Sequence, residues 1–277
     1  MLSQVARRLG RLAGLEPRRV VHLEGGLGSQ LLGMMTYLTH KREDRRWKCD
    51  VSYFFPEVKE PTFIGAAVRR PWELERYGYS LHSPTFTTSR RSFFRRDYES
   101  EARNETETLA KISSSNWSSR FALPHEAREK LEQLPLRGSS QFAAIHVRRG
   151  DYLTVASRVV SMNESIAIAR RARALLPNTI VFLSDDPFTD SDHEQVAKNL
   201  SGLNCIFLEE RDPHISHGIM RLSQVLVTSN STFSWTASVM MERDDAIALA
   251  PLKFFGERQL ALNSMFQASG DWMFLRR

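Results

Sequence analysis

The chain has few cysteines and no long hydrophobic run. Its two cysteines, Cys49 and Cys205, stand in neither a CxxC nor a Cys/His spacing. We therefore do not expect a disulfide framework or a structural zinc site, and a reducing, cytoplasmic setting fits best. Because no stretch of about eighteen apolar residues occurs, a membrane-spanning helix is not expected either.

The first 18 residues are basic and contain no apolar core of the kind that a signal peptide needs. Val5, Leu9 and Leu12 recur at helical spacing among arginines, which predicts a short amphipathic helix. Two interpretations stay open for this segment. It is either a solvated chain end or a peripheral contact that holds the protein at the inner face of a membrane.

Positive charge exceeds negative charge, with a formal net charge of +6. This balance favours an acidic partner such as a nucleotide, a nucleic acid or an anionic membrane surface. Residues 90–96 interleave arginines with Phe93 and Phe94, a composition found in some nucleic-acid-binding segments. Since no known nucleic-acid module accompanies it, we expect a substrate-facing surface there and no nucleic-acid partner.

Apolar runs and helical patterns alternate from residue 138 to residue 256. Strands that alternate with helices of this length predict a parallel sheet covered on both faces, which is an α/β, Rossmann-like fold. The expected strands span 142–147, 179–183, 205–208, 225–228 and 246–250, and the expected helices span 161–176, 191–200, 213–223 and 233–241.

The amino-terminal part has a weaker pattern. We expect a strand over 20–23, a glycine turn, a helix over 31–40, a second strand over 50–55, loops and short helices over 60–119, and a helix over 124–134. A linker-like stretch around residues 135–140 places a domain boundary after residue 137. The predicted organisation is a basic segment (1–18), a first domain (19–137), a second domain (138–256) and a carboxy-terminal helix (257–277) that could pack back on the first domain.

The end of the expected strand 142–147 carries the most informative residues. It leads from His146 into Arg148, Arg149, Gly150 and Asp151. Arginine side chains bind phosphate oxygens in a bidentate way, and open α/β sheets bind ligands outside the carboxyl ends of their strands. The pattern therefore predicts an anionic ligand, although paired arginines are also common on solvated surfaces.

Two later strand ends carry complementary chemistry. Asp185 follows the strand 179–183 and could accept hydrogen bonds from guanine or ribose. After the strand 225–228, the residues that open the next helix could face phosphate with their hydroxyl and backbone N–H groups: Asn230, Ser231, Thr232, Phe233 and Ser234. Helix capping is the simpler explanation for each segment alone, but the two together with the arginines indicate a diphosphate.

Glycines Gly25, Gly26 and Gly28 follow the first expected strand. They lack the GxGxxG spacing, and no acidic residue closes a strand about twenty positions later, so NAD is not expected. The glycines either permit close approach of a ligand to the backbone or simply form a tight turn.

Four segments together resemble the inverting alpha-1,2-fucosyltransferases, a GDP-fucose-dependent family of bacterial surface-polysaccharide type. The family's GGLGNQ, HxRRGDY, SDD and NSTFSW motifs are matched at Gly25–Gln30, His146–Tyr152, Ser184–Asp186 and Asn230–Trp235. Ser29, Leu32, Gly33 and Thr236 depart from the family pattern. These departures leave the acceptor sugar and the linkage less determined than the donor.

The resemblance implies a GT-B-like α/β fold, in which two Rossmann-like domains face a central cleft. It also implies transfer of L-fucose from GDP-fucose to a glycan hydroxyl, such as the 2-OH of a galactoside, with no cofactor and no metal. By matching positions, the catalytic residues would be Arg148, Arg149 and Asp151, the donor-binding residues His146, Asp185, Asn230, Ser231, Thr232, Phe233 and Ser234, and the acceptor-side residues Gly25, Gly26, Gly28 and Gln30.

Three alternatives and one gap remain at this point. Asp190-Ser191-Asp192 has a DxD spacing that could hold a metal against a diphosphate, although helix capping also accounts for it. The chain could also be a catalytically silent GDP-sugar-binding protein, or a transferase that uses another nucleotide sugar. The general base is open, because a carboxylate beside two arginines, such as Asp151, would be a weak base.

Overall fold

The computed structural model describes residues 20–55, 70–87, 107–136, 141–149, 160–251, 267–269 and 272–276. The chain divides into two compact units, residues 1–112 and 113–277. The sequence places the boundary later, after residue 137. The intervening helix α4 (His125–Glu132) packs on α7 (Pro213–Leu222), where Ala127 lies directly against Gly218, so this stretch is part of the second unit.

The first unit contains a small parallel sheet and one long helix. The strands β1 (Val20–His22), β2 (Lys48–Asp50) and β3 (Phe86–Thr87) pair in that order. Helix α2 (Leu27–Glu43) begins earlier than predicted, because Gly25 adopts a φ of 75° and turns the chain immediately after β1.

The second strand of this unit was predicted over 50–55, and that prediction is wrong. The strand β2 ends at Asp50, and the 3-10 helix η1 (Ser52–Phe54) follows. The cause is local, since the Asp50 carboxylate accepts a hydrogen bond from the backbone N–H of Ser52 at 2.9 Å. A side-chain acceptor for the N–H two residues on stabilises a turn and ends the extended backbone.

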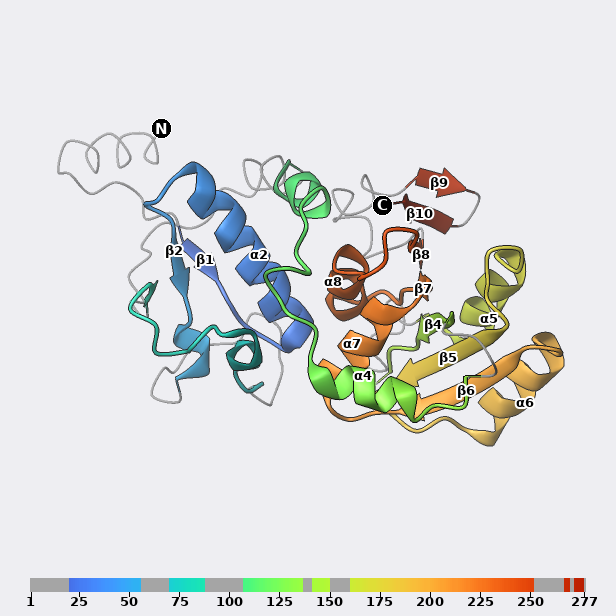
Figure 1. Cartoon of the computed structure of the whole chain (residues 1–277). Helices are drawn as coiled ribbons and strands as arrows, with labels where there is room; N and C mark the ends of the chain where they lie inside the picture. The colour runs from blue at the N-terminus through green and yellow to red at the C-terminus, as the bar shows by residue number, and fades with distance from the viewer. Residues whose placement is uncertain are drawn as a thin grey trace, which may run out of the picture. The chain divides into compact units, whose positions relative to one another are not determined.

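The second unit is built around a seven-stranded sheet, which confirms the predicted mixed α/β fold with a parallel sheet (Figure 1). The strand order is β6-β5-β4-β7-β8-β10-β9, and the pairs from β6 to β8 are all parallel. The parallel strands are β4 (Ala143–His146), β5 (Thr179–Ser184), β6 (Asn204–Glu209), β7 (Val225–Val227) and β8 (Ile247–Pro251).

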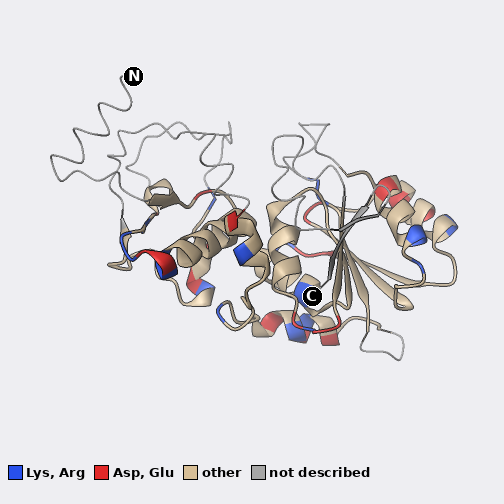
Figure 2. Ribbon diagram, turned by 90° about the horizontal axis from the view of Figure 1, so that it is seen from above, with Lys and Arg blue, Asp and Glu red and all other residues tan. Residues whose placement is uncertain are grey.

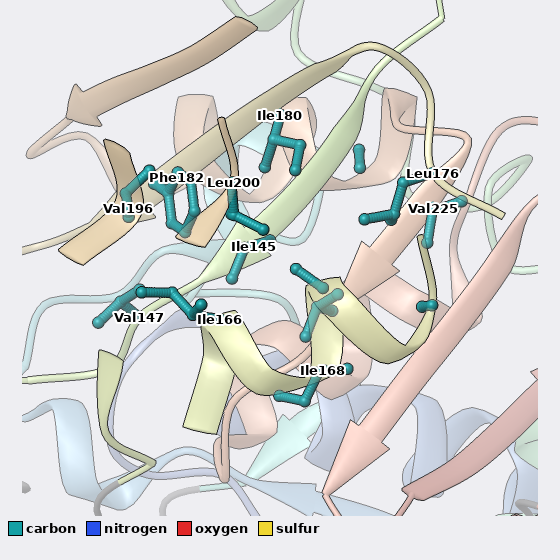
Figure 3. Close-up of a cluster of buried hydrophobic side chains, with 14 of the residues drawn as sticks. Ile145, Val147, Ile166, Ile168, Leu176, Ile180, Phe182, Val196, Leu200 and Val225 are labelled. Atoms are coloured by element: carbon teal, nitrogen blue, oxygen red, sulfur yellow. The ribbon is translucent and has the colours of Figure 1, made fainter. Parts of the chain in front are cut away.

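Helices cover both faces of this sheet (Figure 1). Helices α5 (Met162–Arg171) and α6 (Asp190–Asn199) pack on one face, and α4, α7 and α8 (Thr232–Val239) pack on the other. In Figure 3, Ile166 and Ile168 of α5 lie beside Ile145 of β4 and the neighbouring strands. Lys, Arg, Asp and Glu lie mainly on the helices and connections, while the strands are mostly uncharged (Figure 2). The pattern is that of strands buried on both faces.

The predicted carboxy-terminal helix over 257–277 is wrong for the residues that the structure describes. Strands β9 (Gln267–Ser269) and β10 (Trp272–Arg276) occupy this segment, and β10 pairs antiparallel with β8 and with β9. Two residues, Gly270 and Asp271, separate the strands. A Gly-Asp pair between two such runs is a sequence signal for a hairpin. The strand β10 of this pair extends the sheet at the edge of β8.

Candidate functional site

The order of strands in the second unit reverses between β4 and β7. From β4 the chain first adds β5 and β6 on one side, and β7 and β8 are then added on the other side. Ligands of open α/β sheets bind at such a switch point, outside the carboxyl ends of the strands. Arg148 follows β4, and residues 228–231 follow β7, so two segments predicted to bind a donor lie at the two sides of this point.

A buried histidine connects the two strand ends. The Nδ1 atom of His146, the last residue of β4, lies 2.7 Å from the hydroxyl oxygen of Ser229, which follows β7. Burial, and secondarily the charge of Arg148, lowers the pKa of His146 to about 3. The imidazole is therefore neutral at physiological pH and joins the two segments by a hydrogen bond.

The His146 ring also belongs to a small cluster of tilted aromatic rings. The ring centroid of Phe233, in the first turn of α8, lies 5.4 Å from that of His146 and 5.3 Å from that of His217. His217 is fully buried and its Nε2 lies 3.1 Å from the hydroxyl of Thr236. Burial, with the nearby charge of Arg221, holds the pKa of His217 well below its usual value. Neither His217 nor Ser229 had a signal in the sequence. His217 belongs to no motif, and Ser229 lies directly before the matched segment Asn230–Trp235.

The first arginine of the motif forms an ion pair with the predicted base-binding carboxylate. Arg148 Nη1 donates to Asp185 Oδ2 at 2.6 Å, and the Asp185 side chain is 41% exposed. The structure thus brings these two predicted residues together at the ends of the neighbouring strands β4 and β5. The Arg148 side chain is 19% exposed, so solvent reaches the pair mainly from the side of Asp185 and weakens its attraction.

The second arginine pairs with a buried carboxylate and with an exposed backbone carbonyl. Arg149 Nη2 donates to Asp192 Oδ2 at 2.6 Å, and Nη1 donates to the carbonyl oxygen of Pro187 at 2.9 Å. Its guanidinium carbon lies 5.4 Å from the ring centroid of Phe188. The Asp192 side chain is 8% exposed. Burial acts to raise the pKa of Asp192, but hydrogen bonds from Arg149 and Thr189 outweigh it and lower that pKa.

The DxD-like run therefore lies at a helix start. Thr189 caps α6 in a capping box with Asp192, whose carboxylate accepts from the Thr189 backbone N–H at 2.7 Å. Asp190 and Asp192 both belong to the first turn of α6, where acidic residues are favourable. The carboxylate of Asp192 thus accepts hydrogen bonds from Thr189 and Arg149, and helix capping accounts for the DxD spacing.

The residues that open α8 divide into buried and accessible ones. Ser231 is the N-cap, and its hydroxyl accepts from the Phe233 backbone N–H at 3.2 Å. Ser234 is fully buried, and its hydroxyl accepts from the Ser229 backbone N–H at 3.2 Å. Ser234 was predicted to face phosphate, but in this structure its hydroxyl is bonded to the backbone of the loop that precedes α8. Asn230 is also buried, whereas Thr232 and Phe233 are half-buried at the start of the helix.

The glycine turn and Gln30 lie in the first unit. Gln30 is fully buried, and its amide donates to the carbonyl oxygens of Gly25 at 2.9 Å and Pro71 at 2.8 Å while it accepts from the Glu73 N–H at 2.9 Å. In this structure the amide supports the turn, and the assignment of Gln30 to the acceptor side stays a prediction. A Cβ atom added at Gly26 would meet no atom within 4 Å, so open space lies over this residue. Gly28 is buried.

A histidine–aspartate pair in the same unit had no signal in any motif. His22 Nδ1 lies 2.8 Å from Asp50 Oδ2, at the carboxyl ends of β1 and β2. Burial acts to raise the pKa of Asp50, but hydrogen bonds from His22 and Ser52 outweigh it and lower that pKa. The ionised carboxylate can only accept, so His22 carries its proton on Nδ1.

Some predicted features fall outside the described residues, namely the catalytic candidate Asp151, the amphipathic segment 1–18 and the arginines of 90–96. Within the described ranges, no helix combines the length and the apolar character that a bilayer crossing requires. In that same part of the chain, no three His, Cys, Asp or Glu side chains are grouped as metal ligands would be.

Comparisons with known proteins add little to this description. No protein-family model matches the chain, and no curated protein matches it. Among solved structures, a crystal structure of POFUT1 in complex with GDP-fucose is similar with a TM-score of 0.35 and 16% identity, over 50% of this chain. The chain spans 46% of the length of that protein. A similarity this small supports no argument about fold or function.

Proposed function

We propose that this protein is a glycosyltransferase that moves L-fucose from GDP-fucose to a hydroxyl of a glycan acceptor, the 2-OH of a galactoside, with inversion and without a metal. One observation carries the proposal. The motif segments after β4 and β7 meet at the switch point of a parallel sheet, where the hydrogen bond between His146 and Ser229 ties them together.

The donor would lie across the carboxyl ends of β5, β4 and β7. Its diphosphate would replace Asp185 as the partner of Arg148 and would lie at the positive end of the α8 dipole, near Thr232. Asp185, released from this pair, would accept hydrogen bonds from the guanine N1 and N2 donors. His146 is neutral and buried, and through its hydrogen bond to Ser229 it would hold the segments after β4 and β7 in place.

Charge stabilisation explains how such a site would accelerate the transfer. The acceptor oxygen forms a bond to the anomeric carbon while the bond from that carbon to the diphosphate oxygen breaks, so negative charge grows on the departing GDP. Once the donor has bound, the Arg148 guanidinium and the positive end of the α8 dipole would already face the leaving group and would stabilise this charge without further reorganisation. In the GT-B-like arrangement that we propose, the first unit supplies the acceptor side through Gly25, Gly26 and Gly28, and Asp151 belongs to the catalytic motif.

Two assays test the proposal. A thermal-shift comparison of GDP, ADP, UDP and CDP should show the largest stabilisation by GDP. Release of GDP from GDP-fucose, with and without a simple galactoside and in the presence of EDTA, should show turnover that EDTA does not abolish. Equal shifts for all four nucleotides would contradict the donor assignment. Tight GDP binding without release or transfer would instead indicate a silent binding protein.

A further inference from the structure

The two arginines of the motif differ in the kind of partner they hold. The partner of Arg148 is an exposed carboxylate on the next strand end, whereas the partner of Arg149 is the buried carboxylate of Asp192. A buried ion pair with good geometry is a fixed contact, because leaving either charge unpaired costs several kcal/mol. If Arg148 changes partner, the carboxylate that it leaves is solvated, whereas a change of partner by Arg149 would leave the buried Asp192 carboxylate without its counter-charge.

The buried carboxylate of Asp192 is the centre of a small, partly buried network. Its Oδ2 atom accepts from Arg149 Nη2 at 2.6 Å, from the Thr189 N–H at 2.7 Å and from the Thr189 hydroxyl at 2.8 Å. It thereby fixes both the start of α6 and the guanidinium that follows β4. A hydrogen-bonded network of this kind holds side chains in one arrangement.

The network sets the path of residues 185–189, which connect β5 to α6. Arg149 donates to the carbonyl oxygen of Pro187 and lies over the ring of Phe188. The Phe188 N–H donates to Glu209 Oε1 at 2.9 Å, so the segment is also anchored to the end of β6. Asp185 is the first residue of this connection.

We infer that Asp192 is a positioning residue, which acts through Arg149 to hold the connection 185–189 and with it the carboxylate of Asp185. This rests on the proposed function, since it assigns Asp185 to the nucleoside and Arg148 to the diphosphate. Arg149 then supports the site without contacting the ligand.

Guanosine and GDP separate these roles, because they share the nucleoside and differ in the diphosphate. Arg148→Gln should weaken GDP binding by about 10- to 100-fold and leave guanosine binding nearly unchanged, since one charge-assisted contact to phosphate is lost. Asp192→Asn should weaken both ligands by the same factor, about 3- to 10-fold, because the contact that is disturbed is the one between Asp185 and the nucleoside. Titration calorimetry and competition binding measure both.

Two further variants keep the test decisive. Asp190→Asn removes the same charge from an exposed position in the same turn of α6 and should change neither affinity. Arg149→Lys keeps the charge but cannot reach Asp192 and the Pro187 carbonyl together, so it should reproduce the uniform loss even if Asp192→Asn folds poorly. Urea unfolding verifies that each compared variant is folded.

Different results would overturn the positioning role of Asp192 and the proposed use of GDP-fucose. A loss of GDP affinity with unchanged guanosine affinity in Arg149→Lys or Asp192→Asn would show that Arg149 binds the diphosphate itself and would overturn the positioning role. Unchanged affinity for both ligands would overturn it as well. A native protein that binds neither GDP nor guanosine would refute the proposed function.

Discussion

Replacing His146 by asparagine should remove part of the acid sensitivity of the second unit. The imidazole is buried between β4 and β7, and burial lowers its pKa from 6.5 to about 3. In the unfolded chain the same imidazole takes up a proton near pH 6.5. Between these two pH values the unfolded state binds a proton that the folded state does not, so the free energy of unfolding falls as the pH falls.

The size of the effect follows from the width of that window. Each pH unit inside it costs about 1 kcal/mol, so lowering the pH from 7.5 to 5.5 should destabilise the native protein through His146 by about 1 kcal/mol. His217 adds a contribution of the same sign, because burial also lowers its pKa. His146→Asn keeps a polar group near the position of Nδ1, which meets the Ser229 hydroxyl, but cannot titrate in this range.

Urea unfolding at pH 7.5 and pH 5.5 measures the difference. The native protein should lose about 1 kcal/mol more than His146→Asn over this interval. His125→Asn is the matched control, because it makes the same substitution at a side chain that is 80% exposed. The same pH dependence in the native protein and in His146→Asn would refute the assignment of a buried, neutral histidine at this position.

Four further predictions concern single residues, and urea unfolding checks their effects on stability. Gln30→Leu should destabilise the first unit by about 2 to 4 kcal/mol, because it leaves buried backbone partners of the amide unsatisfied; a loss below about 0.5 kcal/mol would contradict the supporting role. Gly218→Ala should cost about 1 to 3 kcal/mol, since the new Cβ would lie 2.4 Å from the Cβ of Ala127. Gly26→Ala, which meets nothing within 4 Å, should stay within about 0.5 kcal/mol of the native protein yet lower transfer, and full transfer activity would argue against a ligand near this turn. Glu242→Gln should cost about 2 to 4 kcal/mol, because it removes the charge that is paired with the fully buried Arg221, and Arg221→Met should cost less.

The second unit could be predicted closely from its sequence. Runs such as Thr179–Ser184 are buried along their whole length and are bounded by caps and turns, so hydrophobic pattern and local signals agree. The hairpin of β9 and β10 could not be placed in the same way, because its first strand is short and its pairing depends on the free edge of β8.

The candidate site was predictable in its residue types but not in its pairing. Arg148 and Asp185 were both expected to face a ligand, and the structure shows that they face each other. The roles of Asp192 and Ser229 depend on residues far away in the sequence, Arg149 and His146, and strand order alone brings these partners together. The structural role of Gln30 could not be predicted, because a buried amide and a ligand-binding amide look alike in a motif.

The sharpest test is a crystal structure of the protein with GDP bound. We expect diphosphate oxygens within hydrogen-bonding distance of Arg148 and close to the start of α8, with the base beside Asp185 and with Arg149 still paired to Asp192. GDP bound elsewhere on the chain, with the Arg148–Asp185 pair intact, would contradict it.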